Sequence, residues 1–462
     1  MNAIIFSALL GVVMMFSGII TKDKGIIRLV AVLSLSVLLL ANIFETYEVW
    51  TIQVNVREML VFQRFGLFFN FIAIASTLIF VLLNGKDFER VGIHVAEYYA
   101  LILFVLCGVA ILSSYNTLLM LFLGIEIMTI PLYVLTGASK KNLKSNEAAL
   151  KYFLMGSFST GIMLMGIALI YGATGTFNIV SNNTALSFHQ ELKIIEPLGL
   201  LLVFVAMAFK VSAAPFHFWT PDVYDGAPCV FTSFMASVVK AAGFIAFIRL
   251  FESRYIDLRY SWNIILILVI ISTLLVGNIT AVFQQSVKRM LAYSSIAQAG
   301  FMLFALYSHN DLSEEGILLY AVAYSLATIG TFAVLIKMKD VAFEGYNGLA
   351  KTQPVLAATN TIFLLSLAGV PLTAGFFAKY YMLASVVKAG GQSVAWLVIV
   401  AVLFAAVSVY YYFRVIQAMY FKEGNVETQP ITRSFKFGLI ALAALIILLG
   451  IYPTIVLNWL YF

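Results

Sequence analysis

The sequence predicts an all-α polytopic membrane protein with about 14 transmembrane helices. Three observations support this fold class: 62% of the 462 residues are hydrophobic, only 11% are charged, and the apolar residues are spread along the whole chain. A soluble domain carries about 25% charged residues. So few charges cannot cover a water-exposed surface, so the chain is expected to lie in the membrane along its whole length.

Apolar runs long enough to cross a bilayer, about 20 residues each, recur fourteen times. The fourth and fifth runs are separated only by the polar stretch 113–116. The first run also fits the apolar part of a signal peptide, but no basic stretch precedes it and no small-residue cleavage site follows it, so we expect a first helix. The expected spans lie near residues 3–20, 27–45, 62–84, 95–113, 115–138, 146–172, 197–221, 228–251, 262–283, 290–309, 315–337, 354–387, 394–421 and 434–460.

Lysine and arginine are distributed unevenly between the loops. Of the 28 basic residues, seventeen fall in odd-numbered loops and seven in even-numbered loops. Because basic loops stay on the cytoplasmic side, the odd loops are expected in the cytoplasm and both termini on the outer side. This distribution also explains the net charge of +6, so no nucleic-acid partner is expected.

Five charged residues are assigned to the interior of expected spans and not to loops: four lysines, and one carboxylate that lies deep inside a span. They are Glu126, Lys151, Lys210, Lys240 and Lys379. A charge at the bilayer centre costs about 2.5–3.5 kcal/mol on insertion scales, so five unpaired central charges would cost on the order of 12–17 kcal/mol. A cost of this size indicates a function. Lys151 lies nearest to a helix start, where its ammonium group can reach the membrane surface.

Three of the nine prolines, Pro131, Pro215 and Pro371, lie inside expected spans. A proline removes a backbone donor and kinks or breaks a helix. Non-helical backbone at membrane depth occurs only where it is buried in protein or lines a wet cavity. Each of these prolines lies within eight residues of one of the five ionisable residues, so a hydrated path is expected beside them.

The two strongest breaks are predicted at residues 213–215 and 369–371, in the seventh and twelfth spans. Five spans separate them, and an odd offset requires that a repeat be inverted in the membrane. Inverted repeats with broken helices at matching positions are typical of transporters. We therefore expect two inverted five-helix repeats, each with a broken helix.

Buried lysines of this kind can carry protons. Desolvation disfavours the charged form of an amine, so a lysine inside a span can both accept and release a proton. A carboxylate about 4 Å away opposes this by roughly 4 kcal/mol at an effective dielectric near 20. Movement of Glu126 relative to Lys210 would therefore control proton release. The alternative is a static ion pair joining two helices, although one deep carboxylate cannot pair four lysines.

His217 is a further candidate for proton relay, because histidine titrates near neutral pH. The alternative is a buried histidine with satisfied hydrogen bonds. Cys107 and Cys229 form no CxxC pair, the four histidines are scattered, and the sequence has no dinucleotide or phosphate-binding motif. We therefore expect no metal and no cofactor in this chain, and energy that comes from an ion gradient or a partner.

The motif around Lys210 indicates a family. It resembles the signature of the antiporter-like subunits of respiratory complex I and of Mrp-type sodium/proton antiporters. Four other segments resemble the fifth, sixth, tenth and twelfth helices of that family, so that the resemblance covers roughly residues 95–421. The segments are FKVSAAPFHFWTPDVYDGAP (209–228), LGIE (123–126) with PLY (131–133), EAALKYF (147–153), VKRMLAYSSI (287–296) and GFFAK (375–379).

Three features resemble subunit N of bacterial NADH:quinone oxidoreductase within this family. The form Pro-Asp-Val-Tyr-x-Gly-Ala-Pro is similar to subunit N. A lysine at position 379 is similar to subunits N and L, whereas subunit M has a glutamate. Subunit L continues into a long lateral helix, whereas this sequence ends one span after the thirteenth.

The resemblance implies a role for each buried charge. Glu126 would pair with Lys210 in a first half-channel, Lys240 would link toward Lys379, and Lys379 would pass the proton to the outer side. Lys151 would assist near the cytoplasmic entry.

The resemblance also implies the organisation and the partners. Residues 1–94 would form an N-terminal three-helix segment, 95–251 the first inverted repeat (helices 4–8), 262–421 the second (helices 9–13) and 422–462 helix 14. The partners would be the other membrane and peripheral subunits of complex I in the bacterial inner membrane, including neighbouring antiporter-like subunits. Those partners would bind NAD, FMN, iron–sulfur clusters and quinone.

Three functions remain to be separated. The chain could be a proton-pumping subunit of a redox-driven complex, a subunit of a secondary sodium/proton antiporter, or a membrane scaffold without transport. The Val223-Tyr224 form favours the first over the second, and the four buried lysines disfavour the third.

Overall fold

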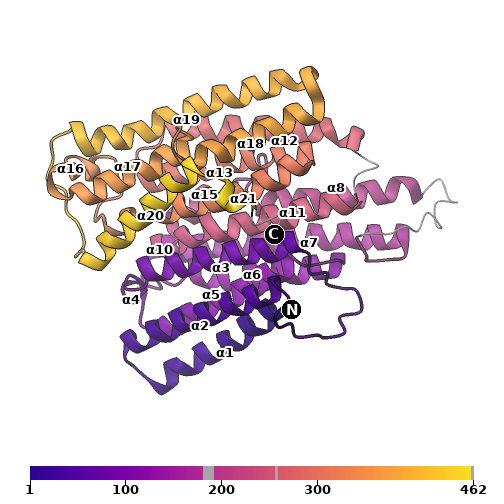
Figure 1. Ribbon diagram of the computed structural model, residues 1–462, viewed down its shortest axis with the longest axis horizontal. Helices are drawn as coiled ribbons and strands as arrows, with labels where there is room; N and C mark the ends of the chain where they lie inside the picture. The colour runs from indigo at the N-terminus through magenta and orange to yellow at the C-terminus, as the bar shows by residue number, and fades with distance from the viewer. Residues whose placement is uncertain (180–191, 255–258, 459–462) are drawn as a thin grey trace. The chain divides into compact units, whose positions relative to one another are not determined.

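The computed structural model of the chain describes residues 1–179, 192–254 and 259–458. Within these ranges the protein is helical, and β-structure is limited to isolated bridges (Figure 1). Twelve helices among the described residues are long and apolar enough to cross a membrane. The prediction of a polytopic helical membrane protein is therefore confirmed. The other two expected spans, near 197–221 and 354–387, are the two with the strongest predicted breaks.

The chain divides into two compact units. The first unit contains Met1–Ala75, Gly92–Trp219 and Val239–Trp262, and the second contains Ser76–Val91, Thr220–Val238 and Asn263–Phe462. Helix α3 (Arg64–Asn84) contributes residues to both units.

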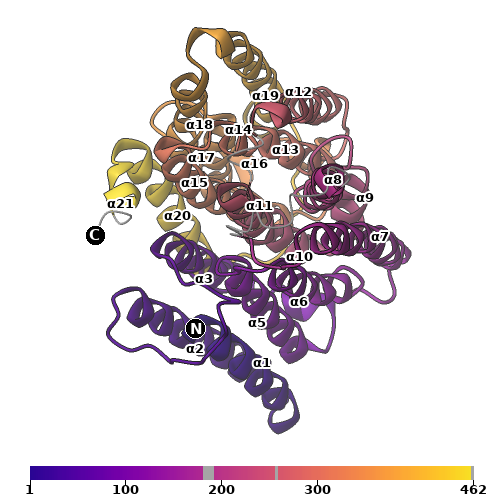
Figure 2. The same cartoon turned by 90° about the vertical axis from the view of Figure 1, so that its right-hand side faces the viewer.

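Helix α5 is the centre of the first unit. It is apolar on all sides and almost completely buried, as expected for a helix surrounded by others. Helices α1 and α6 pack along it, and α7 and α8 pack together as a long pair (Figures 1 and 2). The helices of this unit, α5 included, are α1 (Asn2–Ile20), α2 (Lys24–Thr46), α5 (Val95–Leu112), α6 (Leu118–Thr136), α7 (Leu143–Thr174), α8 (Leu192–Lys210) and α11 (Lys240–Arg254).

A buried arginine fixes the loops at one end of the first unit. The Arg249 guanidinium group donates to the carbonyl oxygens of Tyr115 at 2.8 Å, Ser113 at 3.1 Å and Val61 at 3.1 Å. It also donates to the Gln63 side-chain oxygen at 3.3 Å. A buried loop carbonyl needs a hydrogen-bond donor, and the Arg249 side chain supplies donors to the carbonyl groups of two loops.

Helix α15 is the centre of the second unit. It starts at a capping box formed by Asn310 and Ser313, and nearly all of its length is buried. Helices α10, α17, α18 and α20 pack against it. The helices of this unit are α4 (Phe88–Val91), α9 (Trp219–Gly226), α10 (Cys229–Phe234), α12 (Arg259–Val282), α13 (Val287–Met302), α14 (Phe304–Ser308), α15 (Asp311–Lys337), α16 (Leu349–Thr352), α17 (Pro354–Ala368), α18 (Ala374–Gly390), α19 (Ala395–Phe421), α20 (Arg433–Ile451) and α21 (Thr454–Leu457).

The three internal prolines have different effects. Pro215 lies between α8 and α9, and Pro371 lies between α17 and α18, so both expected breaks are present. At Pro131 the helix α6 continues, because one missing N–H is not enough to end a helix that is packed on both sides.

A π-helix, Met235–Val239, joins α10 directly to α11. The sequence pattern did not indicate it. Such wide turns are frequently found at functional sites, and this one ends immediately before Lys240.

Candidate functional site

The break after α8 positions Lys210. Helix α8 ends at this residue, the chain turns through Ser212 at a φ of 64°, and the peptide bond before Pro215 is cis. The indole nitrogen of Trp219 donates to the carbonyl oxygen of Phe209 at 3.0 Å. The indole therefore satisfies a carbonyl at the helix end, and Lys210 remains at the edge of the break.

The Lys210 amine has no acceptor among the described residues. Its Nζ atom is buried and makes no hydrogen bond, and the nearest ring, of Phe209, has its centroid 6.0 Å away. A buried ammonium group without an acceptor is costly. The Lys210 amine is therefore either charged and hydrogen-bonded to water, or neutral. It can exchange a proton in both cases.

Glu126 acts on Lys210 through space and does not contact it. The charge of Glu126 is close enough to interact electrostatically with the lysine, but the carboxylate accepts its hydrogen bond from the Thr160 hydroxyl, at 2.9 Å. Glu126 and Thr160 lie on the neighbouring helices α6 and α7. The first unit thus brings these two predicted residues together without the direct ion pair that would lock two helices.

An aromatic wall lies beside this pair in the first unit. The rings of Tyr152 and Trp219 are stacked with centroids 4.8 Å apart, and Tyr133 meets Tyr152 edge to face at the same separation. The Tyr133 hydroxyl is buried and has no partner among the described residues. Gly156 allows its approach, because a Cβ atom there would lie 2.2 Å from the hydroxyl oxygen.

Lys151 and His217 are less enclosed than Lys240 and Lys379. The Lys151 side chain is 42% exposed and forms an ion pair with Glu147, one turn earlier on α7, at 2.8 Å. His217 is half-buried in the break, its ring lies against Phe218, and its Nδ1 atom is buried without a partner among the described residues. Lys151 is therefore a partly exposed, ion-paired residue of α7, and His217 is a half-buried residue of the break.

Lys240 is the most deeply buried of the four predicted lysines, at 2% exposure. It is the first residue of α11, directly after the π-helix. The wide turn shifts the register of the side chains that follow it, so the position of Lys240 depends on this irregular segment.

In the second unit Lys379 donates to the end of a broken helix. Its Nζ atom, on α18, donates to the carbonyl oxygens of Leu367 at 3.0 Å and Ala368 at 2.8 Å. These are the last two residues of α17, whose C-terminal end carries partial negative charge. Gly369 ends α17 at a φ of 83°, and a Cβ atom there would lie 2.8 Å from Cδ of Lys379.

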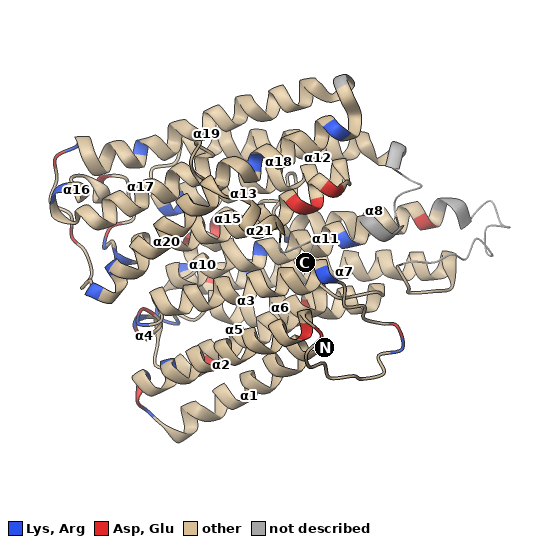
Figure 3. Ribbon diagram, viewed as in Figure 1, with Lys and Arg blue, Asp and Glu red and all other residues tan. Residues whose placement is uncertain are grey.

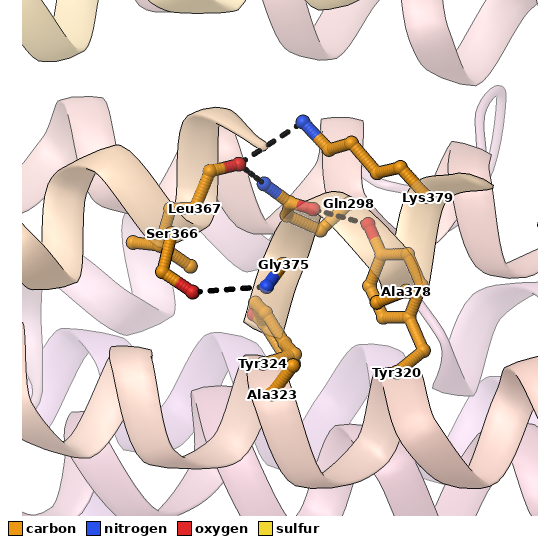
Figure 4. A pocket seen from close by; sticks show the side chains of 9 residues that line it. All are labelled: Gln298, Tyr320, Ala323, Tyr324, Ser366, Leu367, Gly375, Ala378 and Lys379. Carbon is orange, nitrogen blue, oxygen red and sulfur yellow. Dashed lines mark hydrogen bonds between the residues drawn. The ribbon is translucent and has the colours of Figure 1, made fainter. Parts of the chain in front are cut away.

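Gln298 connects Lys379 to a buried polar network. Its amide nitrogen donates to the same Leu367 oxygen at 2.8 Å, and its oxygen accepts from Tyr320 (Figure 4). The amide nitrogen also donates to the Tyr412 hydroxyl at 3.3 Å. Tyr412 in turn shares a hydrogen bond with Ser294. These neutral groups were not predicted; the available signal was a glutamine and several tyrosines inside apolar spans.

A small polar cavity adjoins Lys379. It has room for about one water molecule. The side chains and backbone that line it are those of Gln298, Tyr320, Ala323, Tyr324, Ser366, Leu367, Gly375, Ala378 and Lys379 (Figure 4). A lysine, two tyrosines and an amide converging on one water-sized space form a site suited to proton exchange.

Other buried charges lie at the ends of the predicted spans or between them. Lys337 and Asp87 form an almost fully buried ion pair, with Nζ at 2.7 and 2.6 Å from the two carboxylate oxygens. Lys288 is buried and donates to two backbone carbonyl oxygens, and Arg249 is buried as described above. Apolar run lengths placed these three basic residues in loops, because the length of a run does not detect burial by neighbouring segments. Most other charges lie at helix ends and in connections (Figure 3).

Comparisons with known proteins agree on one family. The family described as "NADH:quinone oxidoreductase/Mrp antiporter, TM" matches residues 115–408. The NADH-quinone oxidoreductase subunit N of Cytophaga hutchinsonii is 39% identical over 99% of both chains.

Two solved structures show the same fold. A chain of respiratory complex I from Thermus thermophilus with bound aureothin is 30% identical, with a TM-score of 0.84 over 99% of this chain and 98% of the other. A chain of the Mrp complex from Dietzia sp. DQ12-45-1b is 20% identical, with a TM-score of 0.87 over 99% and 96% of the two chains. At this identity the second match shows the fold alone.

Proposed function

Since the chain belongs to the family of NADH:quinone oxidoreductase and Mrp antiporter membrane subunits, we propose that it moves protons outward across the membrane in the membrane arm of an NADH:quinone oxidoreductase. Quinone reduction elsewhere in the complex drives the transport. The chain itself contributes no redox centre and acts as one subunit of the translocase.

The observation that carries the proposal is the environment of Lys210. The amine is buried beside a helix break, has no acceptor among the described residues, and interacts electrostatically with Glu126. A lysine held in this way can change its protonation state when the carboxylate moves, because the interaction of the two charges changes by kilocalories over a few ångströms.

The proposed order of transfer follows the family resemblance. Lys151 lies near the cytoplasmic entry, Glu126 controls Lys210, Lys240 links toward Lys379, and Lys379 releases the proton outward. His217 is proposed as a relay within the first break, which its buried and unpartnered Nδ1 atom supports. In this scheme residues 95–251 and 262–421 are two inverted repeats of a fourteen-helix protein, with a three-helix segment at 1–94 and a last helix within 422–462.

The proposed partners follow from the same family. They are the other membrane and peripheral subunits of complex I, including neighbouring antiporter-like subunits, and they hold NAD, FMN, iron–sulfur clusters and quinone. The proposed location is the bacterial inner membrane, with both termini on the outer side.

A second candidate is a subunit of a Mrp-type sodium/proton antiporter, which the shared fold favours. Purification of the tagged chain from its native membrane separates the two. Co-purification with flavin and iron–sulfur subunits is expected. Purification with only other antiporter subunits would show that the first proposal is wrong.

Substitution of the central pair tests the mechanism in the assembled complex. Lys210→Ala and Glu126→Gln are expected to lower coupled quinone reduction and proton uptake into vesicles by roughly tenfold or more, the scale on which a lost proton-transfer group acts. Glu126→Gln keeps an oxygen that can accept from Thr160, so only the charge is removed.

Lys351→Ala is the matched control, because Lys351 is 70% exposed and pairs with Glu423 outside the spans. It is expected to leave both rates unchanged. Full turnover and full proton yield in both pair variants would exclude the proposed role of these residues.

A further inference from the structure

We infer that the cavity beside Lys379 binds one water molecule, and that Tyr324 positions this water as the group with which Lys379 exchanges its proton. The inference rests on the proposed function and adds a residue that neither the motif nor the charge count indicates.

The hydrogen bonds of Lys379 leave one position unused. An ammonium group has three donors, and two of them reach the carbonyl oxygens of Leu367 and Ala368. The ammonium group also lies over the ring of Phe301, with Nζ 4.7 Å from the ring centroid, but a phenyl ring cannot take up a proton. The charged amine therefore has one hydrogen left for exchange, and the neutral amine has one lone pair left. Either way the remaining position needs a partner that can both accept and donate, which a carbonyl oxygen cannot do and a water molecule can.

The other polar groups around the cavity are already engaged. Both amide hydrogens of Gln298 are used by Leu367 and Tyr412, and its oxygen accepts the hydroxyl hydrogen of Tyr320. The Ser366 hydroxyl oxygen accepts from the backbone N–H of Gly375 at 3.2 Å. These bonds fix the cavity wall and leave these groups little capacity to serve Lys379.

Tyr324 is the exception. Its side chain is 4% exposed and lines the cavity (Figure 4), and its hydroxyl, which lies near the Thr328 and Ser295 side chains, makes no hydrogen bond of ordinary distance and angle to a described residue. A buried hydroxyl left unpaired costs about 1–3 kcal/mol, and one water in the cavity removes that cost. The water then has the partners that buried waters require, namely Lys379, Tyr324 and the Tyr320 oxygen.

The proton balance is simple. When the ammonium group releases a proton, one N–H bond of Lys379 breaks and one O–H bond of the water forms. The water then gives a proton to a further water molecule on the outer side: one O–H bond of the first water breaks, one O–H bond of the second forms, and the first water returns to neutral. Tyr324 keeps its own proton throughout, and its hydrogen bond holds the water in line with the lysine, so Tyr324 is a positioning residue.

The test uses the assembled complex in membrane vesicles. Tyr324→Phe removes the hydroxyl and keeps the ring; proton uptake and coupled quinone reduction are expected to fall at least about threefold, with a changed pH profile and a larger solvent deuterium effect. Tyr411→Phe is the matched control, because Tyr411 is fully buried and its hydroxyl binds Asn278 at 3.2 Å outside the cavity wall. It is expected to keep the wild-type pH profile and deuterium effect.

A second pair of variants tests the water itself. Ala323→Val fills the cavity and leaves Lys379 and Tyr324 intact, so the same loss is expected. Ala327→Val, one turn further on α15 and equally buried, does not line the cavity and serves as the control for overpacking.

The Lys379→Ala variant distinguishes a failure of the proposed function from a failure of the inference about the water and Tyr324. If Lys379→Ala has no effect, the proposed function of this lysine is wrong. If it abolishes transport while Tyr324→Phe and Ala323→Val retain wild-type rates, pH profile and deuterium effect, the inference about the water and Tyr324 is overturned and the proposed function stands.

Discussion

Lys210 and Lys379 each lie beside a helix break, but their nitrogens have different surroundings. The Lys210 amine has no acceptor among the described residues, and the nearby helix end is satisfied by the indole of Trp219. The Lys379 amine is itself the donor to the end of α17. Two lysines that look equivalent in the sequence therefore differ in how firmly each is held.

Gly369 allows Lys379 to take its position, and Gly369→Ala tests this. The substitution adds a Cβ atom 2.8 Å from Cδ of Lys379 and places an L-residue at a left-handed φ, which costs roughly 1–2 kcal/mol. Proton uptake in vesicles is expected to fall several-fold more than the amount of assembled complex. The contrary result is a loss of transport that only parallels a loss of assembly.

Gly391→Ala is the matched control for backbone strain. Gly391 also has a positive φ, of 58°, but no atom lies within 4 Å of the added Cβ. Because Gly391 combines this φ with a ψ of −145°, a conformation that L-residues rarely adopt, the variant is expected to cost about 1–3 kcal/mol of stability and to leave transport per assembled complex unchanged.

At the scale of elements, sequence patterns predicted helices better than their interruptions. The polar stretch at 113–116 does separate α5 from α6, and the breaks at Pro215 and Pro371 are present. The continuity of α6 through Pro131 and the π-helix before Lys240 were not predictable, because both depend on neighbouring helices that supply packing and not on local residue preference.

Arg249 joins α11 to two loops, and Arg249→Met tests that connection. The variant keeps much of the side-chain volume but leaves three buried carbonyl oxygens without this donor. Each buried acceptor left unpaired costs about 1–3 kcal/mol, so the apparent melting temperature of the detergent-solubilised protein is expected to fall by several degrees. Arg57→Met, at an exposed loop position, is expected to have no effect. An equal melting temperature for Arg249→Met and the wild type would contradict the role of Arg249.

At the scale of the whole chain, composition and apolar run length were enough to predict a polytopic helical membrane protein. They were not enough to predict which polar groups meet. Glu126 and Lys210 could be found because charge inside a span is rare, whereas Gln298 and Tyr324 are neutral and common in such spans. The ion pair of Lys337 with Asp87 joins residues 250 positions apart, and run length carries no information about such contacts.

The distribution of basic residues predicts the orientation of the chain, and cysteine labelling tests it. In a variant whose native Cys107 and Cys229 are replaced by serine, Lys351→Cys is expected to react with an impermeant maleimide only from the cytoplasmic side. Arg57→Cys is expected to react only from the outer side. Both positions are exposed, and labelling of both from the same side would show that the assigned orientation is wrong.

The hydrogen bonds from Lys379 to the end of α17 link the charge of this side chain to the stability of the helix end. A hydrogen bond from a charged donor contributes about 1.5–3 kcal/mol, and a neutral one about 0.5–1.5 kcal/mol. In the proposed mechanism, release of a proton from Lys379 would therefore weaken the last turn of α17, and uptake of a proton would strengthen it. The stability of this helix end would then depend on the charge of the Lys379 nitrogen. Segments that pack against α17 would be affected by that charge without contacting the proton.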